Sequence, residues 1–412
     1  MNSPIAGTVV IYGPFFARSG FGILARGWAM ALHQAGVKVR IVPVDCDDPN
    51  AAGNLDDCDL YLLQSLKFTP VQTPVTAIFA YVPTYVWPKL PLPEPCRRIL
   101  LTTFDSSANA ATPPSRVTFI GNQMDQVWLA NRTEEQAWIR GGLSPEKVRS
   151  FNWPHEWIDN AQLGVPVVRK RSSGEHFRFL HISLFLPRRR LDVLIRAFFE
   201  EFKKENEAEL VLKMSYPSWH PVPGQPKKDL HALIERLQQE TGSLAKVVVD
   251  ETLGSRLELA RLIDRCDAYV SPDTTHTAPV TEAVVRHRPT IITDGWGVEL
   301  PPQALVVPNL AERVAITPEM ADYMPHQRGA SFPALDVGSM RAALRKTFSL
   351  SSDELRVSVS AAAEFMRERY SFAATAPAAI ACKYGTHADD QWSVDELLAL
   401  VRQHGSSRSA CV

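Results

Sequence analysis

The sequence predicts an α/β protein made of two Rossmann-like domains, each with a doubly wound parallel sheet. The chain of 412 residues is more than twice a typical domain of about 100–200 residues, so two domains are expected. Short apolar runs alternate with helical patterns in two series, one starting at Thr8 and the other at Phe177. The polar, charged segment 169–175 separates these series and is the best candidate for a linker.

Composition excludes several classes of protein. The 44 Lys and Arg residues nearly balance the 45 Asp and Glu residues, which argues against a nucleic-acid-binding protein. The six cysteines contain no Cys-x-x-Cys pair, so no zinc knuckle, redox motif or disulfide scaffold is evident and a reducing cytoplasm is expected. No apolar run approaches the roughly 20 residues that span a bilayer. The uncharged first 17 residues lack the basic start of a signal peptide and are interpreted as a strand and a loop.

The first series opens with a βαβ unit. The apolar run Thr8–Tyr12 is typical of a strand buried on both faces. A glycine-bearing loop follows over 13–22, then a helix over 23–35 that ends at Gly36, then a strand over 37–44. The remaining elements predicted in this series are strands at 60–63, 75–79, 98–101 and 116–120, and a helix at 133–141.

The second series repeats this alternation. Its predicted strands are 177–183, 209–214, 246–250, 268–270 and 290–293, and its predicted helices are 191–205, 230–240, 256–266 and 279–288. Doubly wound sheets bind ligands at the carboxyl ends of their strands. Two such domains therefore predict a ligand in a cleft between them.

Four stretches, in this order, resemble the retaining family 4 of the GT-B glycosyltransferases (glycosyltransferase group 1). They are GPFFARSGFG, MDQVWLANRTEEQAWIRGGL with FNWPHEWID, FRFLHISLFLPRRRLDVLIRAFFEEF with ELVLKM, and RLELARLIDRCDAYVSPDTTHTAPVTEAVVRHRPTIITD. The resemblance covers residues 13–372. It implies an N-terminal acceptor domain over 1–168 and a nucleotide-sugar donor domain over 169–370. FMRERYSFAATAPAAIACKYG resembles the family's returning helices, so residues 371–412 are expected to pack on the first domain.

The family's signature, two glutamates separated by seven residues, is only half present. Glu282 stands at the second position, but Thr274 replaces the first glutamate. Thr275, His276 and Thr277 stand where the family has a glycine, an aromatic residue and a glycine. The resemblance implies that Glu282 holds the ribose hydroxyls, while Thr274, His276 and Thr277 form an altered sugar pocket. The alternative for Glu282 is a carboxylate that starts a helix and favours its dipole.

Positive charge for a diphosphate is predicted after the first two strands of the second series. Arg188 and Arg189 follow the first of these strands at a helix start, and Lys213 ends the next strand. The family has a basic pair here. Arg189 resembles its lysine, and Ser183 stands where many members carry an arginine. The alternative is that the three consecutive arginines are solvated surface charge.

In the first domain, Ser19, Gly20 and Gly22 are expected to approach the same phosphates, although the loop lacks the full G-x-G-x-x-G spacing. Asp105 follows a predicted strand, and two roles stay open for it: orienting an acceptor hydroxyl, or capping a turn. The catalytic histidine of many family members has no counterpart other than His33 or His155.

Metal binding is not expected. The acidic runs 45–48 and 56–59 are interpreted as loops with turn-forming aspartates. Neither His33 nor His155 has metal-ligand spacing to a cysteine or carboxylate. The hypothesis therefore includes neither a metal nor a cofactor.

These observations favour a retaining, metal-independent, hexosyltransferase-like glycosyltransferase of glycan biosynthesis. It would move a sugar from a nucleotide-diphosphate donor to a hydroxyl on a glycan, a lipid-linked or a small-molecule acceptor, with Arg188, Arg189 and Lys213 stabilising the leaving diphosphate. The rival is a degenerate, catalytically weak binding module or partner subunit, because Thr274 lacks a carboxylate. A GT-B epimerase or phosphorylase is less favoured. Peripheral contact with the inner face of a membrane, through 169–171 or 188–190, stays an alternative to solvated charge.

Overall fold

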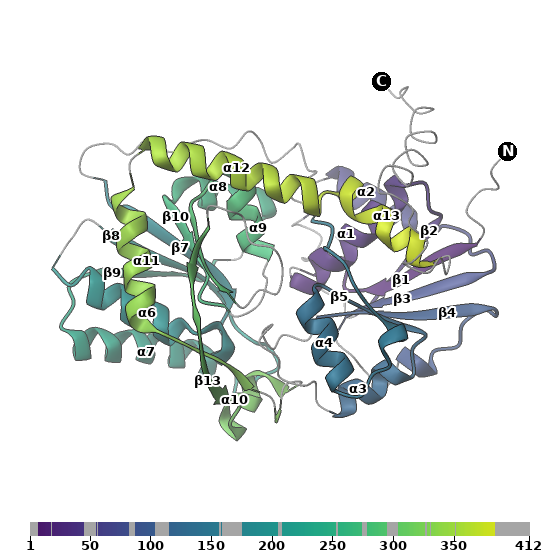
Figure 1. Cartoon of the computed structure of the whole chain (residues 1–412), viewed down its shortest axis with the longest axis horizontal. Coiled ribbons are helices and arrows are strands. Elements are labelled where there is room, and N and C mark those ends of the chain that lie inside the picture. The colour runs from purple at the N-terminus through teal and green to yellow at the C-terminus, as the bar shows by residue number, and fades with distance from the viewer. Residues whose placement is uncertain are drawn as a thin grey trace. The chain divides into compact units, whose positions relative to one another are not determined.

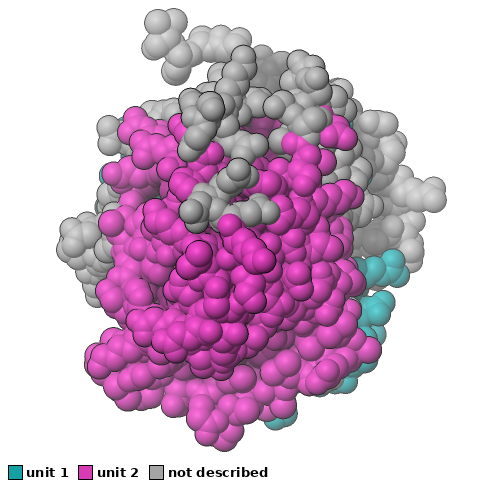
Figure 2. Space-filling model, turned by 90° about the vertical axis from the view of Figure 1, so that its left-hand side faces the viewer, with its two compact units in different colours: residues 1–103, 115–160, 367–412 teal, residues 104–114, 161–366 magenta. Residues whose placement is uncertain are grey.

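A computed structural model of the chain describes residues 7–17, 19–44, 55, 57–81, 87–103, 115–155, 158, 175–204, 208–252, 254–273, 278–294, 304–325, 328–329, 331–350 and 352–383. These residues form two compact units, coloured separately in Figure 2. Unit 1 comes from the ranges 1–103, 115–160 and 367–412, and unit 2 from 104–114 and 161–366. The chain returns to unit 1 within helix α12 (Ser352–Tyr370). Each unit contains a parallel sheet, so the predicted α/β class is confirmed.

The sheet of unit 1 has the strand order β2-β1-β3-β4-β5-β6, and every neighbouring pair is parallel. Its strands are β1 (Thr8–Gly13), β2 (Val39–Pro43), β3 (Val75–Ala80), β4 (Cys96–Leu101), β5 (Gln126–Leu129) and β6 (Val148–Ser150). β3 and β5 are buried along their whole length. This agrees with the continuous apolar runs expected of strands that are covered on both faces.

The helices of unit 1 are α1 (Gly20–Gln34), α2 (Asp57–Leu66), α3 (Ser115–Asn122), α4 (Arg132–Arg140) and α13 (Phe372–Lys383). α1 packs on β1, β2 and β3 and buries Trp28, whose ring centre lies 5.7 Å from that of Trp128. α13 packs against α1, and its Phe372 and Ala376 join the same apolar core (Figure 1). The last described helix is thus part of unit 1.

Two strands predicted in this unit are helices. Residues 60–63 lie in α2, and residues 116–120 lie in α3. Short apolar runs do not distinguish a strand from a helix by pattern alone. Burial shows the helical period: Val117 and Ile120 are buried three residues apart, whereas Phe119 is exposed. The acidic run 56–59, expected to be a loop, instead contributes residues 57–59 to the start of α2.

The sheet of unit 2 has the order β12-β11-β10-β7-β8-β9 and is also parallel throughout. Its strands are β7 (Phe177–Leu184), β8 (Ala208–Ser215), β9 (Lys246–Asp250), β10 (Ala268–Val270), β11 (Thr290–Thr293) and β12 (Leu305–Val307). Its main helices are α6 (Leu191–Glu201), α7 (Gln225–Thr241), α8 (Arg256–Arg265), α9 (Ala278–Val285) and α11 (Val337–Ser349). The antiparallel pair β13 (Asn309–Ala315) and β14 (Ser331–Leu335), with α10 (Pro318–Tyr323), completes the unit.

The core of unit 2 is rich in phenylalanine. Phe179 contacts Phe177, Phe198 and Phe202 at centroid distances between 4.7 and 6.3 Å. This cluster joins β7 to α6, and Phe348 extends it to α11. β7 is therefore the fixed centre of the sheet. Elements that follow its carboxyl end are held on a rigid support.

Candidate functional site at the carboxyl ends of β7 and β10

The strand order of unit 2 reverses at β7. The chain runs from β7 through β8 to β9 on one side, and then from β10 through β11 to β12 on the other. Connections that leave the neighbouring strands β7 and β10 in opposite directions create a crevice at their carboxyl ends, which is where open α/β sheets bind ligands. The residues that follow β7 and β10 are therefore the first candidates for a site (Figure 1).

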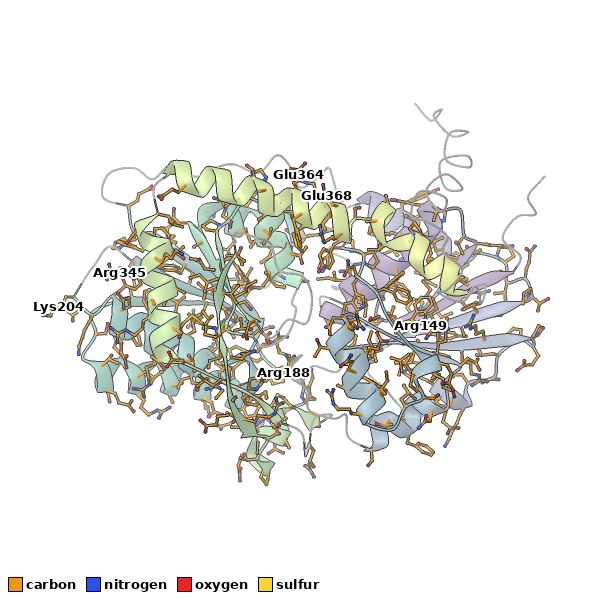
Figure 3. The ribbon with its side chains drawn as sticks, in the orientation of Figure 1. Arg149, Arg188, Lys204, Arg345, Glu364 and Glu368 are labelled. Atoms are coloured by element: carbon orange, nitrogen blue, oxygen red, sulfur yellow. The ribbon has the colours of Figure 1, made fainter. Side chains whose placement is uncertain are left out.

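The three consecutive arginines after β7 are held in three different ways. Arg188 and Arg189 lie in the short 3-10 helix η5 (Pro187–Arg189) (Figure 3). The Arg188 side chain is only 2% exposed to solvent. Arg190 adopts the left-handed conformation with φ 48°, and it pairs with Asp192 at 3.0 Å. Because all three side chains are largely buried, the alternative of solvated surface charge does not describe this run.

Asp273 lies three residues after the end of β10 at Val270, and its carboxylate pairs with the guanidinium groups of Arg188 and Arg189. Arg188 Nη1 lies 3.4 Å from Asp273 Oδ1, and Arg189 Nη1 contacts Asp273 Oδ2. The Asp273 side chain is 1% exposed, whereas that of Arg189 keeps 15%. The sequence contained no signal for this pairing, because residues 188 and 273 meet only when β7 and β10 become neighbours.

A histidine–serine pair lies beside the arginines. His181 is buried in β7, and its Nδ1 lies 2.8 Å from the carbonyl oxygen of Val270. A carbonyl only accepts, so Nδ1 carries the proton and Nε2 accepts the hydroxyl of Ser183, at 2.8 Å. Burial is the main cause that lowers the pKa of His181 to about 4; the hydrogen bond to Val270 opposes this shift, and the charge of Arg189 adds to it. His181 is therefore neutral near pH 7, and sequence reasoning did not identify it.

Lys213, predicted to contact phosphate, is engaged at the carboxyl end of β9. Its ammonium donates to the carbonyl and the hydroxyl oxygen of Thr252 and lies 3.0 Å from Asp250 Oδ1. Burial alone would raise the pKa of Asp250, but hydrogen bonds from Thr252 and Lys213 outweigh it and lower the pKa. The Lys213 ammonium has three N–H donors, and all three face acceptor oxygens of the protein. Lys213 can therefore bind a ligand only by giving up one of these contacts.

Glu282 is buried in α9, with 1% exposure, and it is the fifth residue of that helix. The first turn of α9 contains no acidic residue. The alternative that Glu282 starts the helix and favours its dipole is therefore wrong. A carboxylate buried in this way needs a compensating partner, because an isolated buried carboxylate is unfavourable.

In unit 1, the glycine loop after β1 is built mainly by its own contacts. Ser19 caps α1 by accepting the amide of Gly22 at 3.1 Å. A Cβ at Gly22 would lie 2.2 Å from the carbonyl oxygen of Ala17, so this glycine is required by the chain itself. A Cβ at Gly20 would meet nothing within 4 Å, which leaves Gly20 the more open of the two glycines.

The same loop is held from behind by Arg26. This buried side chain donates to the carbonyl oxygens of Phe15 and Ala17 at 2.7 and 3.0 Å. The loop is thus fixed before any ligand arrives. Whether Ser19, Gly20 and Gly22 approach phosphates stays a prediction.

Several predicted positions lie outside the described residues. They are Asp105, Thr274, His276 and Thr277, together with most of the linker 169–175 and the acidic run 45–48. Their assigned roles remain predictions.

Among the described residues, no group of three or more His, Cys, Asp or Glu side chains could hold a metal ion. His155 is buried, and burial lowers its pKa to about 4. None of the helices searched in the described ranges is both long and apolar enough to cross a membrane.

Comparison with known proteins gives matches in structure only. No family model and no curated protein matches the sequence. The structure of Anabaena HepE in complex with UDP-glucose matches with a TM-score of 0.60 and 12% identity, covering 92% of this chain and 100% of that one. An α,α-trehalose-phosphate synthase (UDP-forming) from Burkholderia vietnamiensis matches with a TM-score of 0.62 and 9% identity, covering 95% and 100%.

The trehalose-6-phosphate structure from E. coli bound with UDP-2-fluoro glucose matches with a TM-score of 0.59 and 10% identity, covering 97% of this chain and 99% of that one. At such identities a match establishes architecture and not chemistry. The matches extend over nearly the whole of both chains and include both parallel sheets. This protein therefore has the GT-B fold, with two Rossmann-like domains of six parallel strands each.

Proposed function

We propose that the protein is a retaining glycosyltransferase that takes its sugar from a nucleotide-diphosphate donor. The observation that carries this proposal is the pair Arg188 and Arg189 at the carboxyl ends of β7 and β10, where the strand order of unit 2 reverses. Of the two guanidinium groups, that of Arg189 keeps 15% exposure and is suited to a diphosphate oxygen, while Arg188 lies buried against Asp273. The matched structures with UDP, UDP-glucose and UDP-2-fluoro glucose support the choice of donor class.

The proposed chemistry needs little from the protein except positioning and charge. As the glycosidic bond to the diphosphate breaks, negative charge grows on the leaving phosphate, and Arg189 stabilises it. Lys213 joins by exchanging its contact with Asp250. The acceptor oxygen bonds to the anomeric carbon on the face that the diphosphate leaves, and its proton passes to the leaving phosphate. The configuration is therefore retained without an enzyme nucleophile or a metal.

The remaining proposed roles rest on the resemblance to family 4. Glu282 accepts the ribose hydroxyls, because one carboxylate can accept both hydroxyls of a vicinal diol. Thr274, His276 and Thr277 shape the sugar pocket. Unit 1 binds the acceptor, which is a glycan, a lipid-linked or a small molecule, and Asp105 orients its hydroxyl. Thr274 offers only a neutral hydroxyl contact, so the sugar should be selected mainly in turnover and less in ground-state binding.

A panel of nucleotide sugars tests the proposal. Each donor is scored for the shift in thermal unfolding temperature and for release of free nucleotide diphosphate, with and without candidate acceptors. Stabilisation with release that depends on acceptor supports a glycosyltransferase. Stabilisation without release under any condition supports the rival, a catalytically weak binding module. No stabilisation by any donor contradicts both.

A further inference from the structure

Asp273 is an acidic residue placed where the proposed function calls for positive charge. Its carboxylate is buried, and both of its oxygens face arginines that were assigned to the diphosphate. The three side chains together carry one net positive charge. A buried carboxylate is costly unless it is paired, so Arg188 and Arg189 make its ionised form stable here.

The two arginines are not equivalent in this arrangement. Arg188 is 2% exposed, so an incoming ligand cannot reach it without rearrangement. Arg189 keeps 15% exposure, and its Nη1 contacts Asp273 Oδ2. A guanidinium has five N–H donors, so Arg189 can bind Asp273 and a phosphate oxygen at once. The geometry thus divides the pair into an internal counter-ion and a ligand-facing group.

The backbone around Asp273 is fixed by β11. Thr293 Oγ donates to the carbonyl oxygen of Asp273 at 2.7 Å, and the amide of Ser271 donates to the carbonyl oxygen of Ile291 at 2.8 Å. Asp273 and Thr293 are both fully buried. The carboxylate is therefore held at a set position relative to β10 and β11, and through it the guanidinium of Arg189 is held as well.

We propose that Asp273 is a positioning residue that orients Arg189 toward the diphosphate of the nucleotide ligand, with Arg188 as its buried counter-ion. This inference rests on the proposed function. Asp273 is followed directly by Thr274, the first position of the altered signature. The residue that orients the phosphate-binding group is therefore also the anchor from which the predicted sugar-reading segment begins.

A second cluster of one aspartate and two arginines in unit 2 provides a control for Asp273. Asp264, in the last turn of α8, lies 3.5 Å from Arg288 Nη2 and contacts Arg286 through two hydrogen bonds. This second carboxylate with two arginines lies at the amino ends of β10 and β11, the edge opposite to the candidate site. Asp264→Asn should disturb an ion cluster of the same kind without touching the site.

The test compares Asp273→Asn, Asp264→Asn and the wild type by calorimetric binding of UDP, GDP and ADP, each beside its nucleoside. Asparagine keeps the shape of aspartate and removes its charge. A purely electrostatic role predicts tighter binding of the diphosphate to Asp273→Asn, because one negative charge is gone. The positioning role predicts the opposite sign: weaker diphosphate binding, by roughly 10-fold or more, with nucleoside binding unchanged.

The expected result is loss of the diphosphate-to-nucleoside preference in Asp273→Asn alone. An unchanged or increased preference in that variant overturns the inference while leaving the proposed function intact. If the wild type binds none of the three diphosphates, the proposed function fails, and the inference fails with it. A further outcome that overturns the inference is an equal loss of preference in Asp264→Asn, because the effect would then come from folding.

A second variant covers the case in which Asp273→Asn does not fold. The double variant Arg188→Met with Asp273→Asn removes one positive and one negative charge, so no new buried charge is left unbalanced. Arg189 remains in place without the carboxylate that orients it. The double variant should bind nucleoside like the wild type and lose the preference for the diphosphate. Retention of that preference contradicts the positioning role of Asp273.

Discussion

The two edges of the unit 2 sheet contain ion clusters of the same composition with different surroundings. At the amino ends of β10 and β11, Asp264 joins α8 to the arginines that precede β11. At the carboxyl ends of β7 and β10, Asp273 joins the arginines of η5 at the point where the strand order reverses. An Asp–Arg–Arg cluster does not by itself mark a ligand site. Binding is proposed for the Asp273 cluster because of its place at the carboxyl ends of the strands, and packing is expected for the Asp264 cluster at their amino ends.

The largest expected effect is on stability, because the two ion clusters are buried to different extents. Arg188→Ala should lower the free energy of unfolding of unit 2 by about 3–5 kcal/mol, the usual cost of leaving one member of a buried ion pair alone. Arg286→Ala should cost less, because the Asp264 side chain keeps 20% exposure and can be hydrated. Hydrogen-exchange protection of the β7 and β10 amides measures both. A greater loss in Arg286→Ala would contradict the ranking.

A fall in pH should destabilise unit 2 through the protonation of His181 in β7. Its folded pKa of about 4 lies below its unfolded value near 6.5. Between these values the unfolded chain binds more protons, so stability is complete above about pH 6.5 and is lost as the pH falls toward 4, by about 3 kcal/mol. Thermal unfolding from pH 8 to 4 measures this loss. His181→Gln should remove the part of the loss that comes from His181, and the part that comes from His155 in unit 1, whose pKa is also about 4, should remain.

Arg189→Ala tests whether the Asp273 cluster, and not the Asp264 cluster, binds the ligand. It should remove one charge-assisted hydrogen bond and weaken nucleoside-diphosphate binding by about 1.5–3 kcal/mol, with nucleoside binding unchanged. Arg288→Ala, the control in the other cluster, should change neither. Isothermal calorimetry with both ligands provides the measurement. Equal losses for diphosphate and nucleoside in Arg189→Ala would mean that the substitution acts through folding.

The smallest of these effects concerns Glu282. If it accepts the ribose hydroxyls, Glu282→Gln should weaken every nucleotide donor by roughly 1.5 kcal/mol, whatever its sugar, because a charged acceptor becomes a neutral one. The matched ligand is the 2′,3′-dideoxynucleotide. Its affinity should be the same for the wild type and the variant. If the dideoxy ligand also binds more weakly to the variant, Glu282 has a structural role within α9 and does not contact the ribose.

The alternation of strands and helices was predictable from the sequence, because continuous apolar runs and one-sided helical patterns are local. The place of the candidate site was predictable too, since Arg188 and Arg189 directly follow a recognisable strand. Two helices were mistaken for strands where the apolar run was too short to show a period, as at Phe119. The pairing of Asp273 with the arginines could not be predicted, because it depends on strand order.

The same limit applies to residues that the chain uses for itself. Ser19 and Gly22 carry a phosphate-loop pattern in sequence, yet the structure uses them to cap α1 and to admit the carbonyl of Ala17. Lys213 ends a strand as expected, but Thr252 and Asp250 already bind its ammonium. Spacing identifies which residue types lie near a site. It does not show which hydrogen bonds the folded chain has already made.

A crystal structure of the protein with a bound nucleoside diphosphate tests the central claim most directly. We expect the diphosphate at the carboxyl ends of β7 and β10, within hydrogen-bonding distance of Arg189. Arg188 should still be buried against Asp273, and Glu282 should contact the ribose hydroxyls. A diphosphate bound elsewhere, or one that contacts Arg188 while Arg189 stays turned away, would contradict it.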